Sequence, residues 1–355
     1  MRQGSIILKS VDLKKRFDRA KKLAELGQKE LKLYPACALL MGDYFRNYYE
    51  EYIGCEKGSL FDIASLTKPI AGITILFHTK TSLDEKIYDF LGEPKSDKDE
   101  KAKIKVKDIL SHKAGFCAHI PLFEKVEEKY QRENIVKGNI ERKNLEFHAR
   151  EIIFDEAWNL PLCYKVGEKC VYSDIGFICL TRFFERKTQK NILELFSDVK
   201  LSLKANRIYF YNYAPKNEKK YIVKTSHDLR VHDENSYYMN SLSLHAGLLS
   251  DAYELSKFCV YFIENIDFSE GEEIVKKGER FFLGFDSFIF EDKILFGHLG
   301  FTGCGFWIEH KRKEFCIFLS NRVFPSYGRY PSQAPKEFLE LRKKIWMIFG
   351  GNESD

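Results

Sequence analysis

The sequence lacks any long apolar run: no uninterrupted stretch in its 355 residues approaches the length of about 18 that a membrane-spanning helix needs. The apolar segment within residues 1–9 is too short for a signal peptide. Charge of one sign is not in excess either, because 57 basic residues are interleaved with 52 acidic ones. We therefore expect no membrane span and no nucleic-acid partner.

Cysteine pairs with the spacing of a metal or redox motif are also missing. The sequence has nine cysteines, an odd number, and no Cys-x-x-Cys motif occurs. Four of them lie in apolar runs, where a free thiol packs like a small hydrophobic side chain. The pattern predicts neither a disulfide framework nor a zinc site, and with the missing signal peptide it predicts a cytoplasmic protein.

What is present, 44% hydrophobic residues, suffices for one large domain or two closely joined ones. Apolar residues at helical spacing predict a surface helix from residue 11 to about 33, followed by strands at 36–41 and 46–53. Apolar runs at 294–297, 304–309 and 315–320 predict strands, the last two as antiparallel neighbours. A closing helix should stop at Gly350. The middle of the chain indicates helices and loops, with no firm assignment between 187 and 224.

The most informative stretch is residues 61–70, which place Ser65 three residues before Lys68 among apolar neighbours. Residues i and i+3 share a helix face, so the hydroxyl and the amine should lie within reach of each other. Pro69 cannot donate to the carbonyl of Ser65, which places the serine at a helix start, where free N–H groups favour negative charge. Alone, the pattern also fits a capping serine and a lysine whose amine reaches solvent.

Two further motifs follow in order, Tyr-Ser-Asp at 172–174 and His-Leu-Gly at 298–300. With Ser65-x-x-Lys68, they resemble the serine β-lactamase and penicillin-binding-protein superfamily, most closely the branch of class C β-lactamases, D-Ala-D-Ala carboxypeptidases and related esterases. The resemblance covers nearly the whole chain. It implies an α/β (α+β), β-lactamase/transpeptidase-like fold, in which an antiparallel sheet is flanked by helices and carries a large inserted helical region.

In domain terms, residues 1–80 and 245–355 are predicted to form the sheet region, and residues 81–244 the mainly helical region. The active site is expected between them. The resemblance implies no cofactor and no metal.

The family's mechanism makes Ser65 the nucleophile of an acyl-enzyme that water hydrolyses, with Lys68 as the activating base. A free lysine is neutral in about one molecule in 2,500 at pH 7, so burial should lower its pKa by roughly three units. Tyr172 would share the proton and pass it to the leaving group. Because the two groups are coupled, the base is not assigned to one of them.

The remaining site residues are carried over from the same family. His298 would add a hydrogen-bond donor and a titratable charge. Gly300 would let the backbone approach the substrate, and the N–H groups of Ser65 and Phe301 would form the oxyanion hole.

Two positions depart from the family's pattern. Asp174 stands where many relatives have asparagine, and its carboxylate would contact the acyl side of the substrate or hold Lys68 or a helix end. Leu299 stands where relatives often have a hydroxyl residue that binds a substrate carboxylate. Leucine cannot make this hydrogen bond, which favours esters and other acyl groups as substrates.

Other polar residues are interpreted more simply. His112 and Gly115 should form a structural turn. The histidines at 227, 232 and 245 do not match the spacing of a metal site, and the role of the loop His232-Asp233-Glu234-Asn235 stays open. Gly303, Trp307 and Asn321-Arg322 are expected to be sheet and core features.

The predicted function is that of a serine hydrolase acting through Ser65 on a small-molecule ester, amide or peptide. One alternative is a D-Ala peptidase or amidase on peptidoglycan-derived fragments. The other is a non-catalytic binding protein that keeps the fold. The oligomeric state is not predicted.

Overall fold

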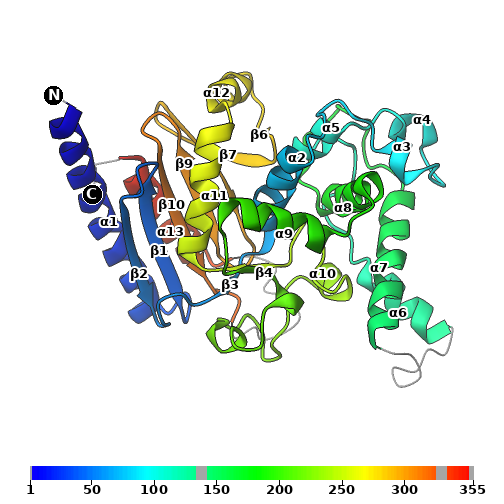
Figure 1. Cartoon of the computed structure of the whole chain (residues 1–355), viewed down its shortest axis with the longest axis horizontal. Coiled ribbons are helices and arrows are strands. Elements are labelled where there is room, and N and C mark those ends of the chain that lie inside the picture. The colour runs from blue at the N-terminus through cyan, green and yellow to red at the C-terminus, as the bar shows by residue number, and fades with distance from the viewer. Residues whose placement is uncertain (1, 133–141, 325–333, 352–355) are drawn as a thin grey trace.

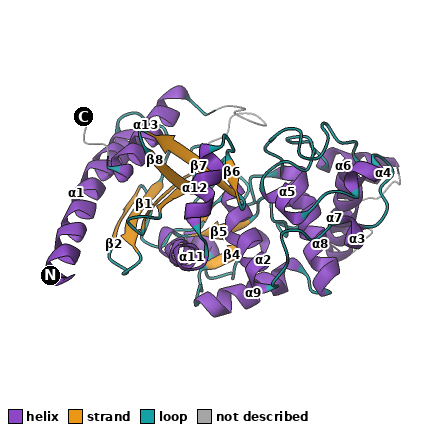
Figure 2. Cartoon of the chain, turned by 90° about the horizontal axis from the view of Figure 1, so that it is seen from above, coloured by secondary structure: helices purple, strands orange, loops and turns teal. Residues whose placement is uncertain are grey.

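The computed structural model describes residues 2–132, 142–324 and 334–351. A seven-stranded antiparallel sheet, ordered β2-β1-β10-β9-β8-β7-β6, carries helices on both faces (Figures 1 and 2). Its strands come from both ends of the chain, as predicted. They are β1 Cys37–Asp43, β2 Tyr48–Ile53, β6 Phe281–Phe282, β7 Phe285–Phe290, β8 Lys293–Leu299, β9 Gly305–Glu309 and β10 Glu314–Ser320.

The two terminal helices cover one face of this sheet. Helices α1 (Arg2–Lys29) and α13 (Lys336–Gly350) pack together against β1 and β10 through a buried apolar cluster that includes Phe17, Phe318 and Trp346. The predicted N-terminal and closing helices are thus confirmed. The second ends one residue later than expected, because Gly351 takes the left-handed conformation (φ 94°) that closes it.

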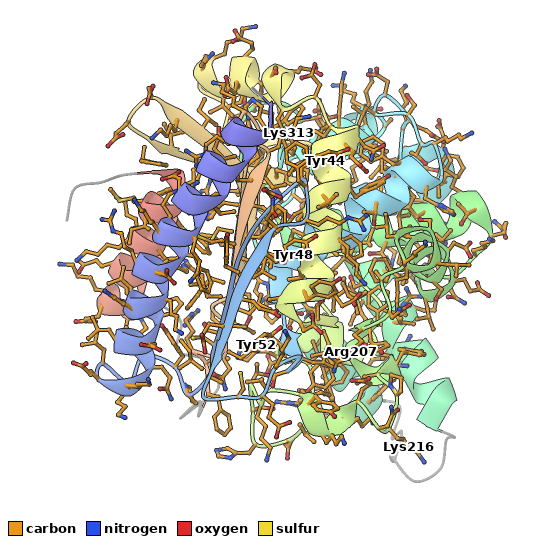
Figure 3. All side chains as sticks on the ribbon, turned by 60° about the vertical axis from the view of Figure 1, so that its left-hand side comes forward. Tyr44, Tyr48, Tyr52, Arg207, Lys216 and Lys313 are labelled. Atoms are coloured by element: carbon orange, nitrogen blue, oxygen red, sulfur yellow. A yellow bond between two sulfur atoms is a disulfide. The ribbon has the colours of Figure 1, made fainter. Side chains whose placement is uncertain are left out.

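Helix α11 (Ala252–Asn265) covers the opposite face. Figure 3 shows Tyr44, Tyr48 and Tyr52 in a row along the β1–β2 hairpin, on the side of α11. The ring of Tyr48 lies 5.8 Å from that of Tyr253 on α11. Burial raises the pKa of Tyr52, which is consistent with a phenol packed between sheet and helix.

A second, three-stranded sheet of order β3-β5-β4 was not predicted. Its strands are β3 Phe61–Asp62, β4 Ile208–Phe210 and β5 Leu248–Ser250. Segments of two or three residues are too short to show a period of two, and β4 lies in the region left unassigned. Strands β6 and β7 were missed as well.

The middle of the chain is largely helical, as expected, and residues 133–141 of the predicted 120–160 helical segment lie outside the described residues. No helix within the described ranges is both long and apolar enough to cross a bilayer. The remaining helices are α2 Thr74–His78, α3 Tyr88–Leu91, α4 Lys98–Lys101, α5 Val106–Leu110, α6 Phe123–Arg132, α7 Arg142–Asn159, α8 Asp174–Thr188, α9 Ile192–Leu203, α10 Glu234–Tyr238 and α12 Phe268–Lys276.

One buried apolar cluster runs from the sheet into these helices, from Leu40 and Phe306 to Phe177 and Phe196. The division of the chain at residues 80 and 245 stays a prediction.

A disulfide joins Cys117 to Cys163, so the expectation that the cysteines form no disulfide was wrong. It ties the loop between α5 and α6 to the segment between α7 and Ser173. The Cys117 carbonyl accepts a hydrogen bond from the Ser173 hydroxyl (2.7 Å). Spacing could not reveal the pair, because its partners lie 46 residues apart.

Replacing Cys163 by serine is expected to lower the free energy of unfolding by about 2–4 kcal/mol, since the cross-link restricts the unfolded chain. Urea unfolding measures the loss, and Cys170→Ser, which removes an exposed free thiol, is the control. Thiol titration in denaturant should find the seven free cysteines before reduction and all nine after it. Nine thiols in the unreduced protein would contradict the disulfide.

Candidate active site

Ser65 lies on an irregular helical turn directly after β3. Residues Ala64–Leu66 form a 3₁₀ turn, and a π-helical segment, Lys68–Ile73, connects it to α2. The regular helix that we predicted from Ser65 is therefore only partly correct, because three kinds of helical turn follow one another. Ala64 has φ 46°, a strained value for a residue with a side chain. Such irregular turns are frequent at functional sites.

Lys68 is fully buried, and its ammonium nitrogen makes three hydrogen bonds. Nζ donates to Ser65 Oγ at 3.0 Å, to Asp174 Oδ1 at 2.7 Å and to the carbonyl of His245 at 2.9 Å. An ammonium has three N–H groups, so these acceptors satisfy all of them. The predicted proximity of the Ser65 hydroxyl and the Lys68 amine is confirmed.

The protonation of Lys68 differs from our expectation. Burial lowers its pKa, but the Asp174 carboxylate and Tyr172 raise it, and the net pKa lies above the ordinary value. We expected burial alone to lower it. The negative charge of Asp174 reverses the direction of the pKa shift of Lys68. The asparagine that many relatives carry at this position would have no such charge.

Of the roles left open for Asp174, the structure shows one, because its carboxylate binds Lys68. Contact with the substrate stays a prediction. Its side chain is 15% exposed and its Oδ2 lies 3.2 Å from Nδ1 of His119. Burial raises the pKa of this carboxyl, yet Lys68 and His119 outweigh burial and hold it well below its usual range. The half-exposed His119 has a raised pKa because it hydrogen-bonds to Asp174. A chain of charges thus runs from Lys68 to the surface.

Tyr172 lies beside the same ammonium, with its ring centroid 4.8 Å from Lys68 Nζ. Burial raises the pKa of the phenol above its ordinary value, although Lys68 and Ser65 act to lower it. The ring of His112 packs against it at 4.6 Å. His112 has φ 56° and its Nδ1 accepts a hydrogen bond from the Ser173 amide at 3.0 Å. The predicted structural role of His112 is thus confirmed, and the residue supports Tyr172.

His298 lies on β8, 2% exposed, with its ring 5.8 Å from that of Tyr172. Nδ1 is 2.8 Å from the Leu299 carbonyl, to which it donates, and burial lowers the pKa to about 4. The ring is therefore neutral at pH 7. Its Nε2 is then an acceptor, with no partner among the described residues. The expected donor and neutral-pH charge were wrong, because burial removes the charge.

Gly300 and Phe301 follow on a turn that touches the Ser65 segment. A Cβ on Gly300 would lie 2.7 Å from the carbonyl oxygen of Ile63, so glycine is required for this approach. The Thr302 hydroxyl donates to the Asp62 carbonyl at 2.7 Å. Phe301, which lies between Gly300 and Thr302 in the chain, is 40% exposed. That the N–H groups of Ser65 and Phe301 form an oxyanion hole stays a prediction.

Asp62, which sequence reasoning missed, joins three segments of the site. Its carboxylate accepts from the amides of Ala64 (3.0 Å) and His232 (2.8 Å), and its carbonyl accepts from Thr302. Burial raises its pKa to about 6. It fixes the turn that carries the serine.

The loop at 232–235 supports the site from the opposite side. His245 Nε2 lies 2.8 Å from Asp233 Oδ1, and its Nδ1 lies 2.7 Å from Ser243 Oγ. Both ring nitrogens of His245 are thus held, which fixes the carbonyl that binds Lys68. The His232 ring packs on Phe301 at 5.4 Å. In the described ranges, no group of three or more His, Cys, Asp or Glu residues is arranged to hold a metal ion.

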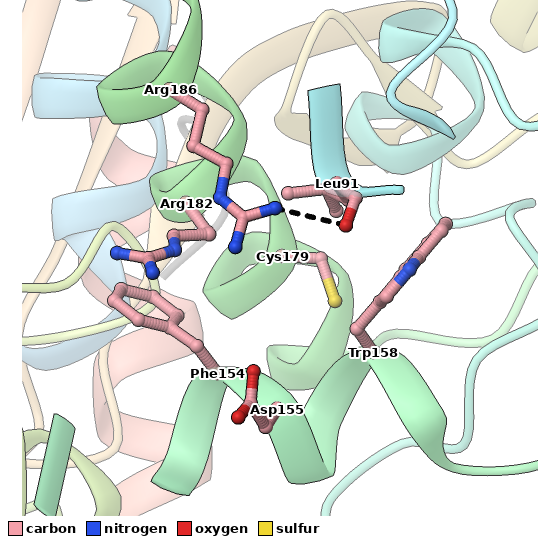
Figure 4. A pocket seen from close by; sticks show the side chains of 7 residues that line it. All are labelled: Leu91, Phe154, Asp155, Trp158, Cys179, Arg182 and Arg186. Carbon is pink, nitrogen blue, oxygen red and sulfur yellow. Dashed lines mark hydrogen bonds between the residues drawn. The ribbon is translucent and has the colours of Figure 1, made fainter. Parts of the chain in front are cut away.

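A small cavity elsewhere is structural. It lies between α7 and α8 (Figure 4), with about 20 Å³ of room, enough for one water. Arg186 closes it by donating to the Leu91 carbonyl at 2.9 Å, and Arg182 pairs with Glu151. These contacts hold helices together.

The residues missed by sequence reasoning, above all His119, His245 and Asp62, share one property. Each contacts the site through a partner far away in the sequence or through its backbone. No local spacing signals such a contact, and only the family motifs could point to the site.

Comparisons with known proteins identify the family and the fold of the chain. A family model described as Beta-lactamase matches residues 45–337. The N-acetylmuramyl-L-alanine amidase of Bacillus subtilis (strain 168) is 27% identical over 229 residues, which cover 56% of this chain and 48% of that protein. The chain thus spans about half the length of this curated relative.

Solved structures show the same fold. EstCE1, a hydrolase with promiscuous acyltransferase activity, superposes with a TM-score of 0.67 at 14% identity, over 96% of this chain and 100% of its own. A β-lactamase/D-alanine carboxypeptidase from Pseudomonas syringae gives 0.65 at 12% identity, over 95% and 98%. Since the family model spans most of the sequence, the chain belongs to the beta-lactamase family, whose members are serine hydrolases.

Proposed function

We propose that this protein hydrolyses an ester, amide or peptide through an acyl-enzyme on Ser65. The observation that carries the proposal is the 3.0 Å hydrogen bond between Lys68 Nζ and Ser65 Oγ, with Tyr172 packed against the same ammonium. Ser65 is half-buried rather than sealed, so a substrate can reach its hydroxyl. A nucleophile in contact with proton-carrying groups is the arrangement that acyl transfer requires.

The active form of the Lys68/Tyr172 pair has lost one proton, which leaves a Tyr172 phenolate beside the Lys68 ammonium. In acylation, Ser65 Oγ forms a bond to the acyl carbon and gives its proton to this phenolate. The N–H groups of Ser65 and Phe301 stabilise the negative oxygen. The pair then protonates the leaving alcohol or amine as its bond to the acyl carbon breaks. Deacylation repeats these steps with water in place of serine.

Because Asp174 keeps Lys68 charged, the mobile proton is that of Tyr172. Lys68 stabilises the phenolate that forms when Tyr172 loses it, and the two titrate as a coupled pair. His298, neutral with Nε2 as an acceptor, can receive a hydrogen bond from an attacking water or a leaving group.

Esters fit this site best, because Leu299 offers no hydroxyl to a substrate carboxylate. A second candidate, an amidase or D-Ala peptidase on peptidoglycan fragments, is favoured by one observation, the similarity to the Bacillus subtilis amidase. The non-catalytic alternative is disfavoured, because the Ser65 hydroxyl lies within hydrogen-bond distance of Lys68.

The test is covalent labelling. Wild-type protein is incubated with a fluorophosphonate and with a penicillin, and the adduct is located by intact mass and peptide mapping. We expect one adduct, on Ser65, and none in Ser65→Ala. An adduct on another residue, or none with any acylating probe, would contradict the proposal.

A substrate panel then separates the candidates. Short-chain aryl esters, a chromogenic β-lactam, D-Ala-D-Ala peptides and muramyl-L-alanine peptides are compared by kcat/KM. Highest turnover of aryl esters supports the first candidate, and turnover confined to the peptides supports the second. An enzyme that labels at Ser65 but turns over none of them points to the binding protein.

The disulfide bears on the compartment in which the protein works. The cytoplasmic location predicted above depended on the missing signal peptide and on the cysteine pattern, and the Cys117–Cys163 bond removes the second of these supports. We propose instead that the protein works where this disulfide persists. Alkylation of thiols during lysis, followed by mass spectrometry of the two peptides, tests whether they are bonded in cells.

A further inference from the structure

Two arginines beside the candidate active site carry charge that no described residue neutralises. Arg322 follows β10 and is half-buried, and Arg342 on α13 is 9% exposed. Across the described ranges, neither side chain forms an ion pair or a hydrogen bond, and Nη1 of Arg322 is buried without a partner. Buried guanidinium groups normally have partners, because an unpaired buried charge is costly.

Other buried arginines of this chain follow that rule. Arg16 pairs with Glu314 at 2.8 Å, and Arg150 forms a two-bond pair with Glu185. Arg342 is as buried as Arg150 but has no such carboxylate. The pair at 322 and 342 is therefore an exception within this protein.

The two guanidinium groups contact the same ring. Both lie over Phe338, at 5.7 Å from its centroid for Arg322 and 5.1 Å for Arg342. Burial and the charge of Arg322 together lower the pKa of Arg342 to about 10, while no carboxylate acts on either group. Residues 325–333, which follow in the chain, contain no aspartate or glutamate. The neighbouring sequence thus supplies no counter-charge.

The pair also adjoins the turn that carries Phe301. The Arg322 guanidinium lies 4.8 Å from the Phe301 ring centroid, and the Arg322 amide donates to the Thr302 carbonyl at 3.1 Å. Asp62 binds Thr302 and, through the Ala64 amide, the turn that carries Ser65. A group bound by the arginines would therefore lie one side chain away from the expected oxyanion hole.

We propose that Arg322 and Arg342 form a binding site for an oxyanion, a carboxylate or phosphate group, beside Phe301. A guanidinium group offers paired N–H donors to such a group, which arginine binds in a two-bonded geometry. The oxyanion is either carried by the substrate or bound as a free ion. The substrate-borne case rests on the proposed function, whereas the site itself does not.

The first experiment measures the site without turnover. Inorganic phosphate is titrated calorimetrically into Ser65→Ala, in a chloride-free buffer at constant ionic strength. We expect the dissociation constant to rise by about tenfold or more when Arg322→Gln or Arg342→Gln is added. Adding Arg46→Gln, which removes an exposed charge on the β1–β2 turn, should leave it unchanged. No phosphate binding, or equal weakening by all three changes, would overturn the site.

A second measurement does not depend on the variants folding. Crystals of the wild-type protein soaked in bromide should show an anomalous peak between the two guanidinium groups. No peak there, with peaks elsewhere on the surface, would overturn the proposal.

The third arm identifies the source of the oxyanion, by comparing wild-type kcat/KM for 3-carboxyphenyl acetate and phenyl acetate. A preference of about tenfold for the carboxylated ester that Arg322→Gln abolishes assigns the group to the substrate. Equal rates, with phosphate bound, assign the site to a free anion. If neither ester is hydrolysed while phosphate still binds, the proposed function fails and the anion site stands.

Discussion

Replacing Lys68 by methionine is expected to slow the acylation of Ser65 by roughly a thousandfold and to lower the free energy of unfolding by about 3–5 kcal/mol. Acylation slows because the substitution removes the charge that stabilises the Tyr172 phenolate. The second arises because Asp174, only 15% exposed, loses the ammonium at 2.7 Å and keeps only His119, at 3.2 Å, as a charged partner. The rate of covalent labelling and the urea midpoint measure the two effects separately.

The double change Lys68→Met with Asp174→Asn separates stability from chemistry. Removing both charges should recover most of the lost stability, because neither partner is left buried alone. Labelling should not recover. A double variant as unstable as the single one would show that the loss comes from packing and not from the unpaired carboxylate.

Lys101 provides a matched control for this experiment. It is also fully buried, but its ammonium binds the carbonyls of Trp158 (2.6 Å) and Leu160 (2.7 Å) and no carboxylate. Lys101→Met should destabilise the protein and leave the labelling of the remaining folded protein unchanged. Loss of labelling in this variant would mean that general loosening, and not Lys68, accounts for the effect.

Asp174→Asn is expected to shift the pH dependence of acylation toward lower pH by roughly 1–2 units, the effect of removing a charge within contact distance. The active form of the Lys68/Tyr172 pair has lost one proton, and the negative charge of Asp174 opposes that loss. In the wild type, acylation should therefore rise toward alkaline pH. In the variant, the same rise begins earlier, so the rate near pH 7 increases about tenfold or more.

The labelling rate of Ser65 is measured between pH 5 and 10, with probes whose own reactivity does not change with pH. Asp233→Asn is the control, because this carboxylate hydrogen-bonds to His245 and is not among the groups that shift the pKa of Lys68. A profile unchanged by Asp174→Asn would show that the ion pair does not govern the proton acceptor. An equal shift of the pH profile in Asp233→Asn would show that the loss of any nearby negative charge has this effect.

Much of the site was predictable because its motifs are local. The proximity of Ser65 and Lys68 survives in the structure even though the helix is irregular, since i and i+3 lie on one side of a 3₁₀ turn. Strands β1, β2, β8, β9 and β10 follow from apolar runs that fill a buried sheet. Local composition suffices where one segment determines its own structure.

Protonation states could not be predicted in the same way. The sign of the Lys68 pKa shift depends on a carboxylate 106 residues away. The neutral state of His298 depends on how completely the surrounding elements bury this residue of β8. No local sequence pattern indicates that burial. The sequence supplies the titratable groups, whereas distances between them set their charges.

The hydrogen bonds of Asp62 have a consequence for how the protein is made. Its partners are separated along the chain, the nearest at Ala64, the next at His232 and the last at Thr302. During synthesis the serine, the lysine and the tyrosine all emerge before Thr302 does. A nascent or truncated chain that ends before this point therefore lacks the contact that joins the turn of Gly300 to the serine. The complete candidate site is thus expected to form only after residue 302 has been synthesised.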